Sequence, residues 1–522
     1  MSENFPTKST ILVLLTALFL SCNTELNEEN PNIILIMGDD IGYSDIGCYG
    51  SEIHTPNLDK LAEDGIQFQT FYNMAKCNPT RSTLLTGLYW GNDRVINMAS
   101  VLKEAGYTTL HSGKEHFDNW VPESCYAKNV FDQSFTFWAS TEYFIPPDST
   151  FGRPFFLNGK KLSATELAIE FPDFYKTDVV TDYALRFLDS AIRQEKPFFL
   201  YLPYHAAHYP LQAKPGDIRK YEGVYEKGWD QIRQARYEKM IELGVIDEKY
   251  ALSAPSDNIN KFRGHPKGDD LIRAKIPLYR PWDSLTETEK TDLELEMTVF
   301  AAIIDCMDQN IGRVIQWLKE QGEFENTLIM YLTDNGSCPY DSNRDFDHPP
   351  GPADSFRTLS AAWANVGNTP FRYFKQFGHE GGSKTQFIVH WPDQIEPGQF
   401  THQVGHLVDI YPTLLEITGA VYPDSINDEP SLPLNGHSLL PVFQGQERAE
   451  PPYLISGYME KFRMFRQGDW KIVKANKGQW QLYDMINDPS EINNLADSLP
   501  DKTAEIAEIY HMEKNKLNKD LE

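Results

Sequence analysis

Three runs of apolar residues, each followed directly by polar side chains, constrain the fold of this chain more than any other feature. The runs cover residues 32–37, 198–202 and 327–332. Continuous apolar runs of this length are typical of strands that are buried on both faces of a parallel sheet. Amphipathic helical patterns at 178–195 and 293–321 come between them. This alternation predicts an α/β fold with a large, mostly parallel sheet sandwiched by helices.

The last part of the chain follows a different pattern. Short strand-like segments separated by turns, and then a helical pattern, occur at 462–466, 470–474, 480–483 and 504–516. These features predict a small C-terminal antiparallel-sheet subdomain with a final helix. We place the boundary near residue 445, which gives a main domain over 31–445 and a C-terminal subdomain over 446–522.

The N-terminus has the pattern of an export signal. Residues 11–20 form an apolar run that is too short to span a bilayer but matches the apolar region of a signal peptide. The run ends in Phe19-Leu20-Ser21-Cys22, which resembles a bacterial lipoprotein signal in which Cys22 would be lipidated. We predict a signal peptide over 1–22, a tether over 23–30, and an exported protein in the periplasm or anchored through Cys22 as an outer-membrane or cell-surface lipoprotein. An ordinary cleaved signal and a buried core strand are the alternatives.

The acidic charge of the chain excludes one class of partner. The 522 residues carry 48 basic and 75 acidic side chains, a formal net charge of −27. A nucleic-acid backbone would be repelled, so we expect no nucleic-acid partner, although a local basic pocket can still hold an anion. Residues 254–280 are locally basic, and they form either a subsite for an anionic polymer or a solvated loop.

Paired oxygen donors follow the first and the third apolar run. Asp39 and Asp40 follow the first run, and Asp334 and Asn335 follow the third. Ligands of open α/β sheets bind beyond the carboxyl ends of the strands, so we expect these side chains to meet. Four oxygen donors predict one hard cation, calcium or magnesium, rather than zinc, which prefers nitrogen and sulfur. For Asp39 and Asp40 alone, a turn with a helix cap is the alternative.

A cysteine motif, C-x-P-x-R, lies between the first two runs. It consists of Cys77-Asn78-Pro79-Thr80-Arg81, and the residues after it predict a helix that begins at or just after Arg81 and ends at Gly87. Cys77 would then lie at or just before a helix N-terminus, where free backbone N–H groups favour negative charge. A partly buried free cysteine in a turn is the alternative. The chain has six cysteines, whose spacing fits no zinc pattern and leaves disulfide pairing open.

Further basic and imidazole side chains accompany this motif. Lys114 and His116 alternate, so an extended segment would direct both to one face; a surface lysine and an unrelated histidine are the alternative. His205 and His208 follow the second apolar run, and Lys375 precedes a glycine-containing stretch.

In this order, these segments resemble the formylglycine-dependent sulfatases, which are arylsulfatase-like members of the alkaline phosphatase superfamily, and in particular the bacterial polysaccharide sulfatases. The matching segments are 32–40, 77–87, 114–116, 208–210, 334–336, 375–382, 406–419 and 470–495. The resemblance implies an alkaline phosphatase/sulfatase-like α/β fold and a sulfuric ester hydrolase activity in the domain over 31–445. It also implies that a maturation enzyme oxidises Cys77 to formylglycine. One calcium ion would be bound by Asp39, Asp40, Asp334, Asn335 and the modified Cys77.

The resemblance further implies a role for each catalytic residue. Arg81, Lys114 and Lys375 would hold the hydrated formylglycine and the sulfate, whose sulfur one diol oxygen attacks to form a covalent sulfo-enzyme. His208, with Lys375, would protonate the leaving alkoxide. His116 would take the proton of the second hydroxyl, which expels sulfate and restores the aldehyde.

A sulfated polysaccharide or oligosaccharide, such as ulvan, carrageenan or a glycosaminoglycan, is the substrate that we expect. Glu115 stands where relatives often have an aromatic residue, and Phe117-Asp118-Asn119 replaces glycine-rich sequence, so the substrate contacts differ from the family pattern. An arylsulfatase of small substrates and a phosphoester or phosphonate hydrolase of the same superfamily are alternative functions. A catalytically silent glycan-binding lipoprotein is a third.

Overall fold

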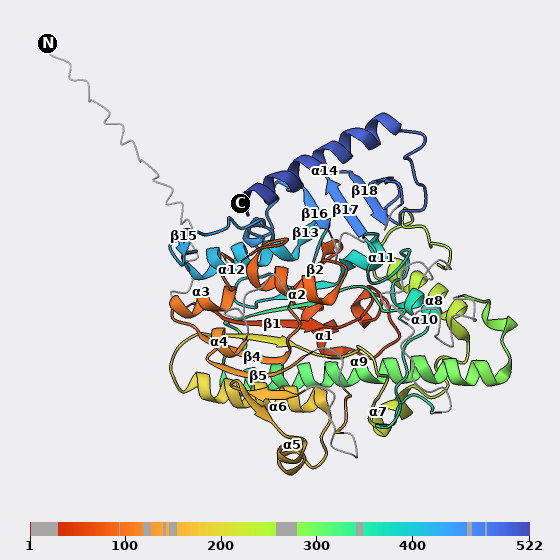
Figure 1. Cartoon of the computed structure of the whole chain (residues 1–522), viewed down its shortest axis with the longest axis horizontal. Helices are drawn as coiled ribbons and strands as arrows, with labels where there is room; N and C mark the ends of the chain where they lie inside the picture. The colour runs from red at the N-terminus through yellow and green to blue at the C-terminus, as the bar shows by residue number, and fades with distance from the viewer. Residues whose placement is uncertain are drawn as a thin grey trace. The chain divides into compact units, whose positions relative to one another are not determined.

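Among the residues that the computed structural model describes, ten strands form one large sheet (Figure 1). The described residues are 1, 30–92, 94–117, 127–138, 142–145, 154–256, 279–340, 348–456, 462–475 and 478–521. Cys22, the tether and most of the basic segment lie outside them. The signal peptide, the lipidation of Cys22 and the basic subsite therefore stay predictions.

The centre of the large sheet is parallel and its flanks are mixed. The strand order is β12-β2-β11-β9-β1-β8-β4-β5-β6-β7. In chain order the strands are β1 (Asn32–Gly38), β2 (Ile66–Phe68), β4 (Thr108–Lys114), β5 (Gln133–Phe137), β6 (Phe155–Leu157), β7 (Lys160–Leu162), β8 (Phe198–Pro203), β9 (Thr327–Thr333), β11 (Phe387–His390) and β12 (Gln399–Thr401). The adjacent strands β9, β1, β8, β4 and β5 run parallel to one another. In contrast, β11 pairs antiparallel with β9 and β2, and β6 pairs antiparallel with β5 and β7. The predicted parallel sheet is confirmed, with antiparallel strands added at the flanks, and the three apolar runs form its central strands β1, β8 and β9.

Successive residues of β1 belong to two different hydrophobic cores. Ile34 and Ile36 pack into one core with α1 (Pro56–Glu63), α6 (Lys176–Ile192) and α9 (Glu287–Gln321). Ile33 and Leu35 pack into the other core with α2 (Cys77–Thr86), α3 (Met98–Glu104) and α12 (Ile410–Thr418). Because successive side chains of a strand point to opposite faces, a strand covered on both sides is apolar at every position. This is the physical origin of the continuous runs.

The long helix α9 begins at Glu287, earlier than the apolar pattern predicted. Thr286 and Glu289 form a capping box that satisfies backbone N–H groups at the helix start. The helix ends at Gly322, whose φ of +77° suits glycine at this position. The polar first turns of α9 carry no apolar stripe, so the pattern alone located only its buried part.

The C-terminal part forms the predicted antiparallel sheet. Its strands β16 (Tyr453–Ser456), β17 (Phe462–Gln467), β18 (Trp470–Ala475) and β19 (Gln481–Asp484) pair in chain order. The final helix α14 (Pro500–Asp520) buries Ile506 and Tyr510 and is longer than predicted. The apolar residues of this sheet share the core that contains Ile33, and the boundary near 445 stays a prediction.

Short elements connect these layers. They are η1 (Gly47–Tyr49), β3 (Phe71–Tyr72), α4 (Ala127–Val130), α5 (Ala164–Glu170), α7 (Pro215–Ile218), η3 (Arg219–Tyr221), α8 (Gly228–Glu242), η6 (Trp282–Ser284), α10 (Ala361–Gly367), α11 (Glu380–Ser383), β10 (Lys384–Thr385), β13 (Gly405–His406), η7 (Leu407–Asp409), β14 (Ser425–Ile426), β15 (Glu429–Pro430) and α13 (Leu440–Phe443). None of the described helices combines the length and the apolar character needed to cross a bilayer.

Candidate active site

The carboxyl ends of four adjacent strands bring the predicted site residues together. Asp39 and Asp40 follow β1, Asp334 and Asn335 follow β9, His208 follows β8, and Lys114 is the last residue of β4. Gly113 allows the ends of β4 and β8 to approach, because its φ is +139° and a Cβ there would lie 2.1 Å from the carbonyl oxygen of Pro203. The expectation that polar side chains from separate strand ends would meet is confirmed.

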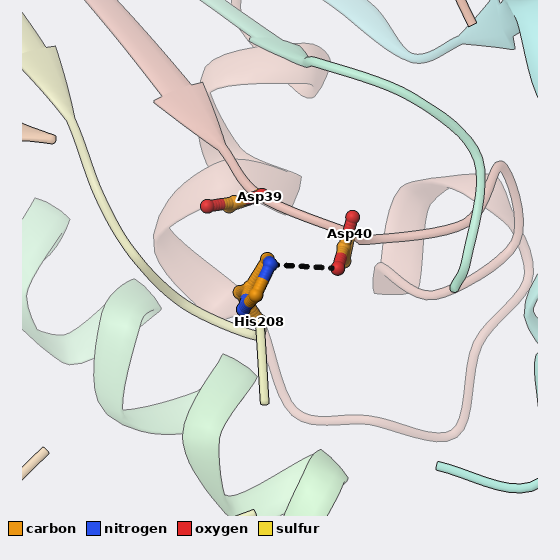
Figure 2. Close-up of side chains that lie close together, drawn as sticks. All are labelled: Asp39, Asp40 and His208. Atoms are coloured by element: carbon orange, nitrogen blue, oxygen red, sulfur yellow. Dashed lines mark ion pairs between the residues drawn. The ribbon is translucent and has the colours of Figure 1, made fainter. Parts of the chain in front are cut away.

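The two consecutive aspartates are held by backbone geometry. Asp39 exchanges two backbone hydrogen bonds of 2.7 Å with the segment after β8, one from its N–H to Ala206 and one to its carbonyl from Ala207. Asp40 has a φ of +61°, in the left-handed region. The chain therefore turns sharply at this point, and both carboxylates lie beside the ring of His208 (Figure 2).

Asp40 is the meeting point of three polar side chains. Its Oδ1 accepts hydrogen bonds from Lys375 Nζ at 2.5 Å and from Asn335 Nδ2 at 2.7 Å. Its Oδ2 lies 3.6 Å from His208 Nε2, the contact that the dashed line marks in Figure 2. Lys375 is 335 positions from Asp40 in the chain, so only the folded protein joins them.

Arg81 and Lys114 neutralise the other two carboxylates. Arg81 is fully buried on α2, and its Nε and one terminal nitrogen donate to Asp334 Oδ2 at 3.0 and 2.7 Å. The same terminal nitrogen lies 3.6 Å from Asp39 Oδ2, and Lys114 Nζ forms an ion pair with that oxygen. Three buried cations therefore face three buried carboxylates.

The helix at the cysteine motif begins earlier than predicted. It starts at Cys77 and ends at Thr86, whereas the sequence pattern placed its start at Arg81. Pro79 does not prevent this, because N–H groups of the first helical turn have no partner within the helix. Cys77 is thus the first residue of α2, at the positive end of the helix dipole.

The three carboxyl groups differ in the direction of their pKa shifts. Burial alone would raise the pKa of Asp39 and Asp40. The nearby cations, chiefly Lys114 for Asp39 and Lys375 for Asp40, outweigh this effect, so both pKa values lie below the ordinary value. Burial and the charge of Asp39 raise the pKa of Asp334 to about 7, despite Arg81. A divalent cation beside them would allow all three groups to ionise together.

Several oxygen atoms of this cluster have the character of metal ligands. Asp39 Oδ1, Asp40 Oδ2 and Asn335 Oδ1 are buried and receive no hydrogen bond from any described residue. Ligand atoms of Asp39, Asp40 and His208 lie within 4.8 Å of one another. Buried acceptors without a donor are costly, and oxygen ligands of this kind suit a hard cation. Asp334 differs, because Arg81 occupies its Oδ2 and the backbone N–H of Asp40 lies 3.3 Å from its Oδ1.

The two predicted catalytic histidines are both neutral in this environment. His208 Nδ1 lies 2.7 Å from the carbonyl oxygen of Tyr209, so Nδ1 carries the hydrogen and Nε2 presents a lone pair to Asp40. Burial lowers the pKa of His208 to about 4, despite the opposing effect of Asp40. Burial and the charges of Lys114 and Arg81 hold the pKa of His116 well below its usual value.

Some residues around the site gave no usable signal in the sequence. Tyr340 lies under Lys375, with Nζ 5.3 Å from the ring centre. Lys176 is buried on α6 over the rings of Phe137 and Tyr143, at 5.1 and 4.9 Å. The apolar stripe of α6 was visible, but a lysine at a helix start normally indicates an exposed end. His205 was noted at its strand end; its Nδ1 lies 3.8 Å from Asp39 Oδ2.

The fold and these residues form a buried site lined by cations at the carboxyl ends of a mostly parallel sheet, which suits an anionic ester. A sulfatase family model matches residues 31–420, and a model described as N-sulphoglucosamine sulphohydrolase, C-terminal, matches residues 370–520. The chain therefore belongs to the sulfatase family, and it is a sulfuric ester hydrolase.

Individual relatives agree with this assignment. An arylsulfatase of Klebsiella aerogenes is 31% identical, with 81% of this chain and 94% of the relative covered. An N-acetylglucosamine-6-O-sulfatase of Bacteroides thetaiotaomicron is 25% identical, with 93% and 87% covered. The crystal structure of Ps i-CgsB in complex with k-i-k-neocarrahexaose superposes with a TM-score of 0.65 at 23% identity, over 95% of this chain and 94% of that one, which shows a shared fold.

Proposed function

We propose that this enzyme is an exported sulfatase that hydrolyses sulfate monoesters on a sulfated polysaccharide or oligosaccharide. It uses formylglycine made from Cys77 by a maturation enzyme, and one calcium ion. The observation that carries the proposal is the position of Cys77, at the N-terminus of α2 and within the electrostatic reach of Lys375 and Lys114. A helix N-terminus and ammonium groups together form a site for an anionic ester.

Cys77 fits a precursor better than a thiolate nucleophile. Burial raises the pKa of the Cys77 thiol above its ordinary value, despite the opposing effect of Lys375 and Lys114. A catalytic thiolate needs a lowered pKa, so the unmodified thiol would be a weak nucleophile here. Hydrated formylglycine would supply an oxygen nucleophile and a second hydroxyl at the same position.

The metal site fits calcium through oxygen atoms of this chain. Asp39 Oδ1, Asp40 Oδ2 and Asn335 Oδ1 are buried acceptors that receive no hydrogen bond from the described residues, and Asp334 completes the proposed set together with the modified Cys77. The cation would supply positive charge for the sulfate oxygens. Lys114 and Lys375, which pair with Asp39 and Asp40, would then be released to bind the substrate, beside Arg81.

Proton transfer is assigned from the protonation states of the site. His116 is neutral because its pKa is lowered, which suits a group that accepts a proton. The pKa of Lys375 is raised well above its ordinary value, because Asp40 outweighs the effect of burial, so it remains a cation that can donate to a leaving oxygen. The negative charge of a bound sulfate monoester would also raise the pKa of His208 and let Nε2 gain a proton, so that His208 acts as the acid with Lys375.

The glycan substrate and the location rest on separate support. One relative is named N-acetylglucosamine-6-O-sulfatase, and the Ps i-CgsB structure holds k-i-k-neocarrahexaose. The export signal and the lipid anchor at Cys22 would place the enzyme in the periplasm or at the outer membrane, where polymeric glycans are encountered. A small aryl sulfate is the competing substrate, because the Klebsiella relative is named arylsulfatase.

Modification and loss of Cys77 test the mechanism. Peptide mass spectrometry is expected to find an aldehyde at position 77, and Cys77→Ala is expected to lower turnover of an aryl sulfate by about 10⁴-fold or more, as in other enzymes that lose their nucleophile. Cys48→Ala is the matched control, since Cys48 is a half-buried free cysteine outside the site. An unmodified thiol in fully active protein would overturn the proposed chemistry.

The substrate proposal is tested by direct desulfation assays. Sulfate release from sulfated oligosaccharides of ulvan, carrageenan and glycosaminoglycans is compared with turnover of paired aryl sulfate and aryl phosphate esters. Release from at least one glycan is expected, with aryl sulfate preferred over aryl phosphate. Good aryl sulfate turnover without release from any glycan would refute the glycan substrate.

A further inference from the structure

A pocket lies outside the active site, between the segments that follow β2 and β12 and the C-terminal sheet. Its volume is about 360 Å³, within the range of roughly 300–1,000 Å³ that is usual for small-molecule sites. Its charged and imidazole lining consists of Asp247, Lys249, Glu380, Lys384, His402 and Arg466. None of the described residues that line it belongs to the catalytic or metal-binding set.

Lys384 is the buried cation of this pocket. Its side chain is 1% exposed, and its Nζ lies over the rings of Tyr43, Tyr250 and Phe371 at 5.2, 5.2 and 4.7 Å. Aromatic faces attract a cation, but they do not replace oxygen acceptors. Among the described residues, one carboxylate lies within ion-pairing distance, that of Glu380, with Oε2 at 3.5 Å. This separation is longer than the roughly 2.7–2.9 Å of a charge-assisted hydrogen bond.

Glu380 presents the complementary atom to the same pocket. Its Oε1 accepts hydrogen bonds from Tyr72 at 2.8 Å and from Lys471 at 2.5 Å. Its Oε2 is buried and receives no hydrogen bond from the described part of the chain. A buried acceptor and an underused buried donor therefore line one cavity, and a ligand that bonds to both would recover the energy that their burial costs.

The charge of the pocket favours an anion. The lining holds three cations, Lys249, Lys384 and Arg466, against two carboxylates, Asp247 and Glu380. Outside the lining, Arg466 also pairs with Glu450 at 3.3 Å, and Lys471 is shared between Glu380 and Glu491. Burial, with Arg466 and Lys471 nearby, lowers the pKa of Lys384 to about 8, although Glu380 opposes the shift. A bound anion would favour the charged form of Lys384. The lining thus has one more cation than carboxylates, in a chain whose net charge is −27.

We propose that this pocket is a second saccharide site that takes one oxyanion-bearing sugar, with Lys384 and Arg466 on the oxyanion and Glu380 Oε2 on a neighbouring hydroxyl. A uronate carboxylate and a sulfate ester offer the same oxyanion chemistry, and the volume suits about one sugar ring. The inference goes beyond the proposed hydrolysis and depends on neither the formylglycine nor the calcium ion.

Calorimetric titration of the full chain tests the site without any turnover. The probes are sodium glucuronate, which carries no sulfate for the active site, glucose 6-sulfate in the Cys77→Ala background, and neutral glucose. Binding of glucuronate is expected, with none of glucose. Lys384→Met is expected to weaken it by about tenfold or more, the loss of one charge-assisted hydrogen bond. The probe whose binding is weakened more by Lys384→Met then identifies the preferred oxyanion, because glucose 6-sulfate can also bind in the active site.

Matched variants separate this site from the active site and from misfolding. Lys60→Met, at an exposed lysine, and Lys375→Met, in the active site, are expected to bind glucuronate as the wild type does. Lys249→Gln leaves the buried network intact and is expected to weaken glucuronate binding by about twofold, the effect of a charge at the rim of the pocket. If Lys384→Met does not fold, the binding of glucuronate to Lys249→Gln replaces it as the test. Equal binding of glucuronate and glucose, or a loss in Lys375→Met with none in the pocket variants, would overturn the inference.

Discussion

Two buried clusters, each of which contains both cations and carboxylates, differ in how their oxygen atoms are arranged. Beyond β1 and β9, oxygen atoms of Asp39, Asp40 and Asn335 are buried and receive no hydrogen bond from the described residues. Asp39 and Asp40 form a potential metal-binding group with His208. Between α11 and the C-terminal sheet, one lysine bridges two carboxylates instead. Those distances are 2.5 Å from Lys471 to Glu380 and 2.8 Å from Lys471 to Glu491.

The difference shows that burial of charge does not by itself mark a functional site. In a bridged cluster a lysine of the chain already lies between the carboxylates and joins two parts of the fold, so removing it exposes the cost of an uncompensated buried charge. A cluster with converging acceptors requires a cation from outside to reach the same balance. The second saccharide site borders the bridged cluster only at Glu380 Oε2, the oxygen that Lys471 does not contact by hydrogen bonding.

Removal of the bridging lysine should have the largest effect on stability. Lys471→Met leaves Glu380 and Glu491 buried without their shared cation, and we expect a loss of about 3–5 kcal/mol in the free energy of unfolding. Urea denaturation followed by circular dichroism measures it.

The control is a lysine in an exposed ion pair. Lys502 pairs with Glu505 at 3.1 Å and is 31% exposed, so Lys502→Met should cost less than about 1 kcal/mol. Similar losses in the two variants would mean that the bridged cluster contributes nothing special to stability.

Calcium should stabilise the folded protein through the first cluster alone. At a free concentration about 100-fold above its Kd, the ion is expected to raise the free energy of unfolding by about 2.7 kcal/mol. Asp40→Asn should remove this response, because it removes a charged ligand, whereas Glu491→Gln in the bridged cluster should retain it. Chelator titration with thermal unfolding provides the measurement, and an unchanged response in Asp40→Asn would place the ion elsewhere.

The smallest expected effect comes from the titration of Lys384, which should make the free energy of unfolding increase with pH. Its pKa is about 8 in the folded protein against 10.5 for an ordinary lysine. Between these values the unfolded chain binds more protons, so stability increases as pH rises. Relative to Lys384→Met, the wild type should gain about 1.5 kcal/mol between pH 8 and about pH 9.5.

Urea denaturation at the two pH values tests this sign. Titration of other groups is shared by both proteins and cancels in the difference. A difference that stays constant, or that falls as pH rises, would show that the Lys384 ammonium is not destabilised by burial in the folded state.

Local sequence rules predicted the central strands β1, β8 and β9 correctly, but they placed the start of α2 too late. The runs that became β1, β8 and β9 were visible because two-sided burial makes every position apolar. At α2 the predicted start, at or just after Arg81, was too late, since the helix begins at Cys77 and Pro79 lies in its first turn. Thr80 and Arg81 there contact Asp334, which is more than 250 positions away, and no local pattern contains that information.

The sequence by itself determined the α/β fold, the polar strand ends and the family resemblance, because apolar runs, their breaks and the C-x-P-x-R motif are local. It also indicated Asp39, Asp40, Asp334, Asn335 and Cys77 as residues of one site. Only the tertiary structure decided which oxygen atoms of that set remain unpaired, and that a second charged pocket lies beside Glu380. The reason is physical: hydrogen bonding and burial depend on contacts such as that between Asp40 and Lys375, which are 335 positions apart.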